Sequence, residues 1–234
     1  AYDDLHTAAD TTNPDIEVNS DDEALIMYTS GTTGLPKGAV LTHGNICWDT
    51  ISYLTYAPPR PGDVALLSMP TNHVSGLHMV VNGFFARALP VVVMRQFEPA
   101  EACRLIAEHR VTQACILVTP MQMLLDYPDL HTHDLSSLRS VLTAAAKYNR
   151  AFPASVMHKL ELEHLWFVYG LTEASPMVSV TEFVGEMADR ENTLGRPMWY
   201  LDVRIADDDD QPVAPGEVGE ILVKGPNVFR GYYK

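Results

Sequence analysis

LPVVVMRQFEPAEACRLIAEHRVTQACILV, residues 89–118, is the stretch that decides the fold class of this chain. Its first six residues are apolar and rich in valine, which favours a buried strand. After a turn through Gln96, residues 98–110 predict a helix, with Pro99 in the first turn, where its missing N–H costs no hydrogen bond. Residues 114–118 predict the next strand. This order is typical of a parallel βαβ unit.

The alternation of helix and strand continues along the chain. Two further helices, at residues 121–126 and 152–160, and two further strands, at residues 138–143 and 165–169, are predicted. Farther on, residues 202–205 and 220–223 predict short strands. The expected fold class is therefore α/β, with layered, largely parallel sheets flanked by helices and a smaller β-rich region at the C-terminal end.

Length and local composition divide the chain into three parts. At roughly 150 residues per domain, 234 residues allow one large domain or two small ones. Residues 1–23 are polar and acidic, and we expect them to form a lead-in segment. Residues 24–190 are predicted to form the α/β core, and residues 191–234 are predicted to begin a β-rich subdomain.

The charge of the chain limits its partners. Sixteen Lys and Arg residues against 30 Asp and Glu residues give a formal net charge of −14, which repels nucleic acid over most of the surface. No nucleic-acid partner is expected. An anionic nucleotide such as ATP can still bind, because it needs only a local group of backbone N–H donors and one or two cations.

The longest uncharged run, residues 64–86, is long enough in principle to span a bilayer. It contains Pro70, Asn72 and His73, and such residues are costly in lipid. We therefore predict a strand, a loop and a helix of a soluble core, and no transmembrane segment. No signal peptide is visible ahead of this run either.

Three cysteines indicate the compartment. Cys47, Cys103 and Cys115 are odd in number and lack Cys-x-x-Cys spacing, which favours reduced thiols and a cytoplasmic location. Nothing in the sequence points to a particular oligomeric state.

The loop YTSGTTGLPKGA, residues 28–39, carries groups suited to a polyphosphate. Glycines let the backbone approach a ligand, hydroxyls donate to phosphate oxygens, and Lys37 supplies a mobile positive charge. No Ser or Thr follows Lys37-Gly38, so the loop is not a Walker A motif. From composition alone, a flexible surface loop is an equally good interpretation.

This loop resembles the phosphate-binding signature of the acyl-adenylate-forming superfamily, the AMP-binding enzymes, and most closely that of the acyl-CoA synthetases. A second stretch, YGLTE at residues 169–173, resembles another signature of that superfamily and follows the predicted strand 165–169. Parallel sheets bind ligands at the carboxyl ends of their strands, so we expect both motifs to face one site.

The resemblance implies a role for each matching residue. It implies that the first motif binds the nucleotide through Thr29, Ser30, Gly31, Thr32, Thr33, Gly34 and Lys37. In the second motif it implies that Tyr169 lies against adenine, that Gly170 and Leu171 border the nucleotide, that Thr172 contacts the α-phosphate, and that Glu173 binds Mg²⁺. Thr32 is the implied second Mg²⁺ contact, and Lys37, Thr172 and Glu173 are the implied catalytic residues. Hydroxyl donors and a metal at the α-phosphate would stabilise the negative charge that gathers there.

Two other segments are implied to bind the acid and adenine. Ala144 with Ala145 and Ala146 resembles the small-residue segment that lies along adenine and the acyl group. The stretch PTNHVSG, residues 70–76, resembles the motif whose histidine borders the acid pocket, which implies pocket roles for His73, Gly76 and Ala144. No Asp or Glu occurs in residues 64–97 to pair with an α-ammonium group, which favours a fatty or aromatic acid over an amino acid.

The expected function is ATP-dependent activation of a small-molecule carboxylic acid to an acyl-adenylate, followed in the full enzyme by thioester formation with coenzyme A. One alternative is the amino-acid adenylation domain of a nonribosomal peptide synthetase, and another is a catalytically inert nucleotide-binding fragment. The resemblance covers residue 24 to the end, whereas members of the superfamily continue into a C-terminal domain that carries the adenylation lysine. That domain is absent from this sequence, so we expect the chain as given to be incomplete for catalysis.

Overall fold

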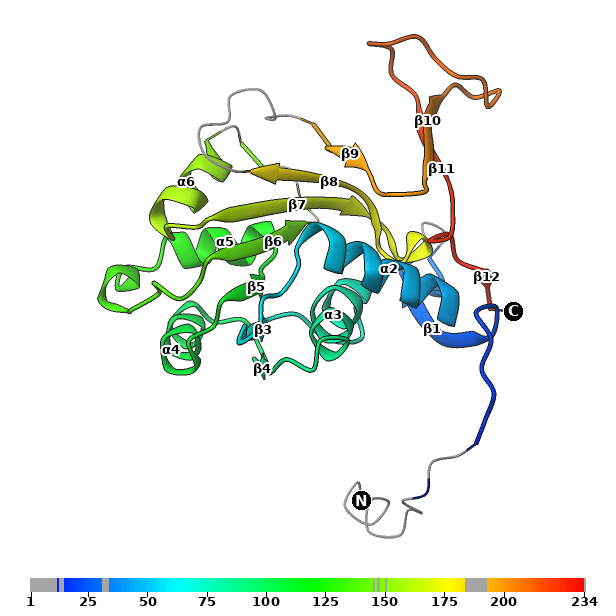
Figure 1. The fold of residues 1–234 in the computed structure, drawn as a ribbon. Coiled ribbons are helices and arrows are strands. Elements are labelled where there is room, and N and C mark those ends of the chain that lie inside the picture. Colours follow the sequence, from blue (N-terminus) through cyan, green and yellow to red (C-terminus); the bar gives the residue numbers. More distant parts are fainter. Residues whose placement is uncertain are drawn as a thin grey trace.

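The computed structural model describes residues 12, 15–30, 34–144, 146, 148–149, 151–183 and 193–233, and for residues 79 and 80 it describes the backbone only. A sheet of seven strands in the order β4-β3-β5-β6-β7-β8-β9 forms the centre of the molecule (Figure 1). In chain order its strands are β3 (Ala65–Leu67), β4 (Val91–Val93), β5 (Gln113–Cys115), β6 (Ser140–Ala144), β7 (His164–Gly170), β8 (Met177–Phe183) and β9 (Arg196–Pro197).

The pairing within this sheet changes once, from parallel to antiparallel. The strands from β4 to β7 are parallel to their neighbours, whereas β8 runs antiparallel to β7, and β9 runs antiparallel to β8. The predicted α/β fold with a largely parallel sheet is confirmed. Because parallel strands end at one edge, Ala144 of β6 and Gly170 of β7 finish at the same edge of the sheet.

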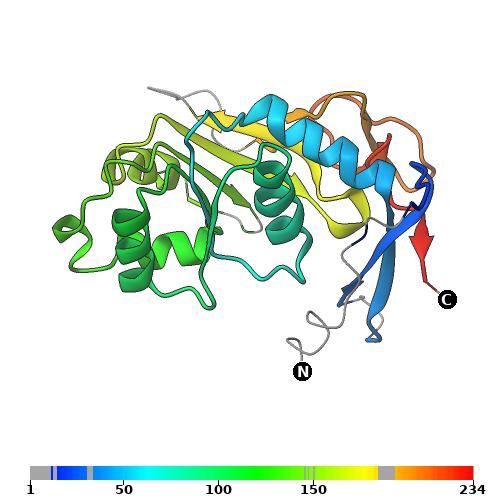
Figure 2. The same ribbon diagram turned by 60° about the horizontal axis from the view of Figure 1, so that its bottom comes forward.

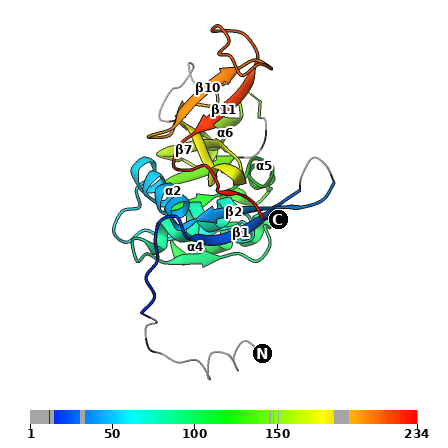
Figure 3. The ribbon, with the colours of Figure 1, turned by 90° about the vertical axis from the view of Figure 1, so that its right-hand side faces the viewer.

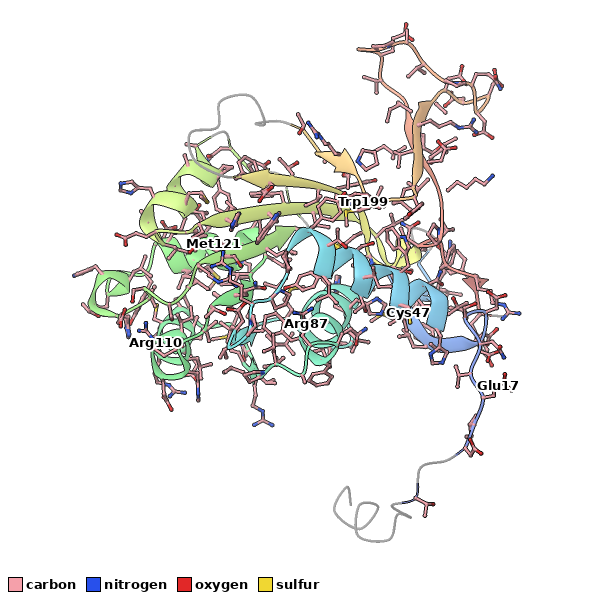
Figure 4. The ribbon with its side chains drawn as sticks, in the orientation of Figure 1. Glu17, Cys47, Arg87, Arg110, Met121 and Trp199 are labelled. Carbon is pink, nitrogen blue, oxygen red and sulfur yellow. The ribbon has the colours of Figure 1, made fainter. Side chains whose placement is uncertain are left out.

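Helices cover both faces of the sheet (Figure 2). One face packs against α4 (Pro99–His109), α5 (Val118–Leu125) and α6 (Phe152–Lys159), and Met121 of α5, labelled in Figure 4, belongs to this core. The other face packs against α2 (His43–Tyr56) and α3 (Gly83–Phe85). Neighbouring strand residues such as Leu165 and Trp166 belong to different cores, as the alternation of side chains along a strand requires.

A second, smaller sheet lies beside the first. It has the order β1-β2-β12, from β1 (Glu23–Thr29), β2 (Lys37–Thr42) and β12 (Gly231–Tyr232), and both of its pairings are antiparallel. The strand that precedes the first motif therefore lies outside the parallel sheet. The motif connects two antiparallel strands, since residues 37–42 return along β1 as a strand that the sequence analysis did not predict.

The elements that the sequence analysis predicted lie within a few residues of their expected bounds. The helix predicted at residues 98–110 is α4, with Pro99 at its first turn and Arg110 in the left-handed conformation at its end (φ 50°). Besides β2, the helix α2 and the strands β8, β9 and β12 were not predicted. For α2 a signal was present, because Thr42 and Asn45 form a reciprocal capping box at its start.

The C-terminal part of the chain contributes to three sheets. The predicted strands at residues 202–205 and 220–223 are β10 (Asp202–Ala206) and β11 (Glu220–Lys224), which pair antiparallel and project from the molecule (Figures 1 and 3). By contrast, β9 joins the large sheet and β12 joins the small one. The division of the chain at residue 191 stays a prediction.

Among the residues that the structure describes, no helix combines the length and apolar character needed to cross a membrane.

The interior position of β7 in the large sheet leads to a stability prediction. Leu165 is 0% exposed in the core beneath α4, α5 and α6, so Leu165→Ala should lower the free energy of unfolding by about 2–5 kcal/mol. Val218 is 98% exposed, and Val218→Ala should change it by less than about 0.5 kcal/mol. Urea denaturation of the two variants measures both values, and equal effects would contradict this packing.

Candidate functional site

The second motif forms a tight turn at the end of β7. The N–H of Leu171 donates to the carbonyl of Pro176 (3.0 Å), which closes a loop around the short 3-10 helix η3 (Thr172–Ala174). A Cβ at position 170 would lie 1.5 Å from the Pro176 carbonyl oxygen, so only glycine fits there. Strand, turn and glycine together hold Thr172 and Glu173 at the carboxyl end of the parallel strands.

The carboxylate of Glu173 connects this turn to the first motif. Its Oε1 accepts a hydrogen bond from Thr29 Oγ1 (3.3 Å), a residue 144 positions earlier at the end of β1. The same oxygen accepts a second hydrogen bond from the hydroxyl of Tyr232 (2.8 Å). The two motifs therefore lie side by side, although the strands that carry them belong to different sheets.

Lys37 lies at this junction as the first residue of β2. It faces Thr29 across the β1–β2 hairpin, and its ammonium nitrogen is 5.2 Å from the centroid of the Tyr232 ring, within cation–π range. Gly34 adopts a positive φ of 93° in the loop between the two strands, which favours glycine there. Ser30 follows Thr29 at the exposed end of β1, whereas Gly31, Thr32 and Thr33 lie outside the described residues, and so does Ala145.

The remaining residues implied for adenine lie along the same edge of the sheet. Tyr169 is half-buried near the end of β7, and Leu171 is exposed. Ala144 is the last residue of β6 and pairs with Val168 of β7, and Ala146 is exposed two residues later. Small side chains thus end β6 beside the turn that carries Thr172.

His73 and Gly76, the residues implied for the acid pocket, lie at the start of a different element. His73 is exposed, and its Nδ1 accepts a hydrogen bond from the N–H of Ser75 (3.3 Å), the first residue of the π-helix η1 (Ser75–Asn82). A Cβ on Gly76 would lie 2.5 Å from the carbonyl oxygen of Pro70, so the turn into η1 requires glycine. π-Helices are rare and are frequent at functional sites.

A buried pair connects η1 with the turn of Glu173. His78 of η1 and Asp49 of α2 are both 0% exposed, with His78 Nδ1 3.9 Å from Asp49 Oδ2 and 3.4 Å from the carbonyl oxygen of Ser175. Because a carbonyl only accepts, Nδ1 carries the proton in this contact. Burial raises the pKa of the Asp49 carboxyl well above its usual value and lowers the pKa of His78, so both groups tend toward their neutral forms.

Three contributors to the site were missed by the sequence analysis. Tyr232 touches Glu173 directly, and the Asp49–His78 pair lies behind its turn. Asn227 is fully buried, and its Nδ2 donates to the carbonyls of Ala174 (3.1 Å) and Met177 (3.2 Å). No pattern in the sequence marked Asn227 or Tyr232 as part of the site.

The groups at the junction suit magnesium in complex with a nucleotide. Among the described residues, no cluster of three or more His, Cys, Asp or Glu side chains is placed to hold a metal by itself. Magnesium prefers oxygen ligands and is usually held by one or two carboxylates together with substrate phosphates. Glu173 supplies one carboxylate. Both of its hydrogen-bond donors bind Oε1, and Oε2 accepts no hydrogen bond from any described residue.

Comparisons with known proteins extend over nearly the whole chain. The model of a family described as "AMP-binding enzyme" matches residues 2–233. The chain is 38% identical over 228 residues to a feruloyl-CoA synthase from Amycolatopsis, an alignment that covers 97% of this chain and 45% of that protein. It is 34% identical over 218 residues to a long-chain-fatty-acid–CoA ligase from Bacillus subtilis, covering 91% of this chain and 38% of the relative.

The fold of the chain is also similar to that of a solved structure. The O-succinylbenzoate coenzyme A synthetase from Bacillus subtilis, in complex with ATP and magnesium ion, matches with a TM-score of 0.83 and 27% identity, over 98% of this chain and 47% of that one. The chain spans less than half the length of each of these three proteins.

The raised pKa of Asp49 leads to a pH prediction. The folded chain keeps the Asp49 proton to higher pH than the unfolded chain, so this group lowers the free energy of unfolding as pH rises above about 4. Asp49→Asn cannot ionise, so its free energy of unfolding should rise relative to that of the unmodified chain as pH rises. The lowered pKa of His78 acts in the opposite sense below about pH 6.5 in both proteins.

Denaturant unfolding of Asp49→Asn between pH 4 and 8 measures this effect. Asp202→Asn, at an exposed strand residue, is the matched control and should follow the unmodified chain at every pH. A stability difference for Asp49→Asn that does not grow with pH would contradict the protonated state of Asp49.

Proposed function

Because the chain belongs to the AMP-binding enzyme family, we propose that it forms the nucleotide- and acid-binding core of an acyl-CoA synthetase. The reaction proposed for the whole protein is ATP-dependent activation of a carboxylic acid to an acyl-adenylate, followed by transfer of the acyl group to coenzyme A. The observation that carries this proposal is the hydrogen bond between Thr29 and Glu173, which joins the phosphate-loop motif to the proposed metal carboxylate.

Each group at the junction has a task in the first half-reaction. An oxygen of the acid's carboxylate attacks the α-phosphorus of ATP, a new P–O bond forms, and pyrophosphate leaves with the electron pair of the broken bond. Lys37 and the hydroxyl of Thr172 are proposed to hold the phosphates and to stabilise the charge that develops there. When bound at Glu173, Mg²⁺ would neutralise part of that charge.

A fatty or aromatic acid is the proposed substrate class. Residues 64–97, which include His73 and η1, contain no acidic side chain to pair with an ammonium group. The carboxyl group of Asp49 on α2 lies 3.9 Å from His78 of η1, but burial favours its neutral form. The relatives named for feruloyl and long-chain fatty acyl groups support this class, and amino-acid activation is the less favoured alternative.

The thioester step with coenzyme A is assigned to the whole protein rather than to these residues. An inert nucleotide-binding fragment stays the alternative for the chain by itself. A cytoplasmic location is part of the proposal, and the three free cysteines, of which Cys103 and Cys115 are buried, are compatible with a reducing compartment.

The proposal predicts a specific defect for Glu173→Gln. The amide lacks the negative charge that attracts the cation, so the gain in ATP affinity caused by Mg²⁺ should fall at least about tenfold, while the affinity without Mg²⁺ is retained. Isothermal titration with ATP, in Mg²⁺ or in EDTA, measures both. Glu220→Gln, at an exposed strand residue, is the control, and an unchanged Mg²⁺ effect in Glu173→Gln would contradict the metal assignment.

A second prediction concerns the acid. His73→Ala should change the ratio of affinities for aromatic and long-chain acyl-adenylate analogues by about tenfold or more while leaving ATP affinity nearly unchanged, because His73 is proposed to border the acyl group only. Competition binding with the two analogues measures the ratio. His131→Ala, an exposed histidine on η2 (Leu130–Thr132), is the control, and equal loss of all ligands in His73→Ala would assign His73 a structural role.

A further inference from the structure

The last segment of the chain, residues 225–233, runs along the turn of Glu173, and we refer to it as the strap. It begins directly after β11 and includes β12, which pairs with β2. The N–H of Phe229 donates to the main-chain carbonyl of Glu173 (2.9 Å), and Asn227 bonds to the carbonyls on either side of the end of that turn. The strap therefore contacts the turn through its main chain as well as through side chains.

The strap is also anchored to the rest of the molecule without help from the Tyr232 hydroxyl. Asn45 of α2 donates through Nδ2 to the carbonyls of Pro226 (2.8 Å) and Val228 (3.1 Å). The N–H of Arg230 donates to Val40, and that of Tyr233 donates to Gly38 (2.7 Å). Because these contacts fix the backbone on both sides of residue 232, removing its hydroxyl should leave the strap in place.

The Tyr232 side chain is aimed at the carboxylate of Glu173. Its ring meets Phe229 edge-on, with centroids 4.9 Å apart and an angle of 73° between the planes, and its hydroxyl is 2.8 Å from Glu173 Oε1. A tyrosine hydroxyl keeps its proton at neutral pH and a carboxylate oxygen only accepts, so Tyr232 is the donor in this contact.

Tyr232 and Thr29 donate to the same oxygen from opposite ends of the chain. Oε1 thereby accepts two hydrogen bonds, whereas Oε2 accepts none from the part of the chain that the structure describes. A glutamate side chain has substantial rotamer freedom, and ordering it costs conformational entropy that must otherwise be lost when a ligand binds. Two donors on one oxygen order the Glu173 side chain before the ligand binds, and they leave the other oxygen free to bind the metal.

We propose that Tyr232 is a positioning residue for Glu173, which together with Thr29 holds Oε1 so that Oε2 is presented to the magnesium ion of a Mg–ATP complex. The inference rests on the proposed function, and it adds a residue to which the sequence analysis gave no role. Partners in such an outer shell orient metal ligands, and losing one typically costs 10–100-fold in metal affinity.

Tyr232→Phe tests the inference because it removes only the hydroxyl. Titration of ATP at several Mg²⁺ concentrations should show that the variant needs 10–100-fold more Mg²⁺ to reach its tighter affinity, while ATP affinity in EDTA is unchanged. Tyr233→Phe is the adjacent control, since the Tyr233 hydroxyl bonds to no described residue. Thr29→Val removes the other hydrogen bond to the same oxygen. In the double variant with Tyr232→Phe, the loss of Mg²⁺-dependent ATP affinity should differ from the sum of the two single losses.

The outcomes separate this inference from the function on which it rests. If the unmodified chain shows Mg²⁺-dependent ATP binding and Tyr232→Phe matches Tyr233→Phe, Tyr232 does not position Glu173 and the proposed function stands. If Tyr232→Phe weakens ATP binding equally with and without Mg²⁺, its role is structural and the inference is overturned. If the unmodified chain shows no Mg²⁺ effect, both proposals fail.

Discussion

One carboxylate oxygen, Oε1 of Glu173, accepts hydrogen bonds from Thr29 near the start of the chain and from Tyr232 near its end. Two such bonds need the β1–β2 hairpin, the turn after β7 and the strap to meet at one point. Each element is fixed separately: the hairpin by antiparallel pairing, the turn by Gly170 against the Pro176 carbonyl, and the strap by pairing with β2. The site therefore depends on how the two sheets are held together.

The large sheet supplies the rigid side of the site. Its parallel strands β6 and β7 end together, packed between α4, α5 and α6 on one face and α2 and α3 on the other, so Ala144 and Thr172 are fixed at one edge. The small antiparallel sheet brings the charge, since Lys37 begins β2. Placing a mobile cation and hydroxyl donors opposite a fixed carboxylate is an arrangement suited to a magnesium-bound polyphosphate. In the wider molecule, His73 lies just before η1, and His78 of η1 contacts the Ser175 carbonyl at the end of the Glu173 turn.

Sequence reasoning predicted what is local and periodic. Residues 98–110 are an amphipathic helix with proline in its first turn, and α4 follows from that alone. In β8, six of the seven residues are buried, with Ser179 and Thr181 among them, so burial does not alternate along this strand as it does where one face meets solvent. The strand β2 was hidden because its first residues also complete the loop motif. Contacts such as Tyr232 with Glu173, or Asp49 with His78, join residues far apart in the chain, and only the packing of the elements reveals them. The motifs identified the residue types of the site, whereas the residues that position them required the structure.

The central claim is that the two motifs joined at Glu173 form one site for an acyl-adenylate. Thermal unfolding of the unmodified chain with non-hydrolysable acyl-adenylate analogues that carry aromatic, long-chain or aminoacyl groups tests it most directly. At about 100 times its Kd a ligand adds roughly 2.7 kcal/mol to the free energy of unfolding, so an aromatic or long-chain analogue should raise Tm measurably and the aminoacyl analogue should raise it less. If none of the analogues raises Tm at saturating concentration, these motifs do not form a working site in this chain and the account is contradicted.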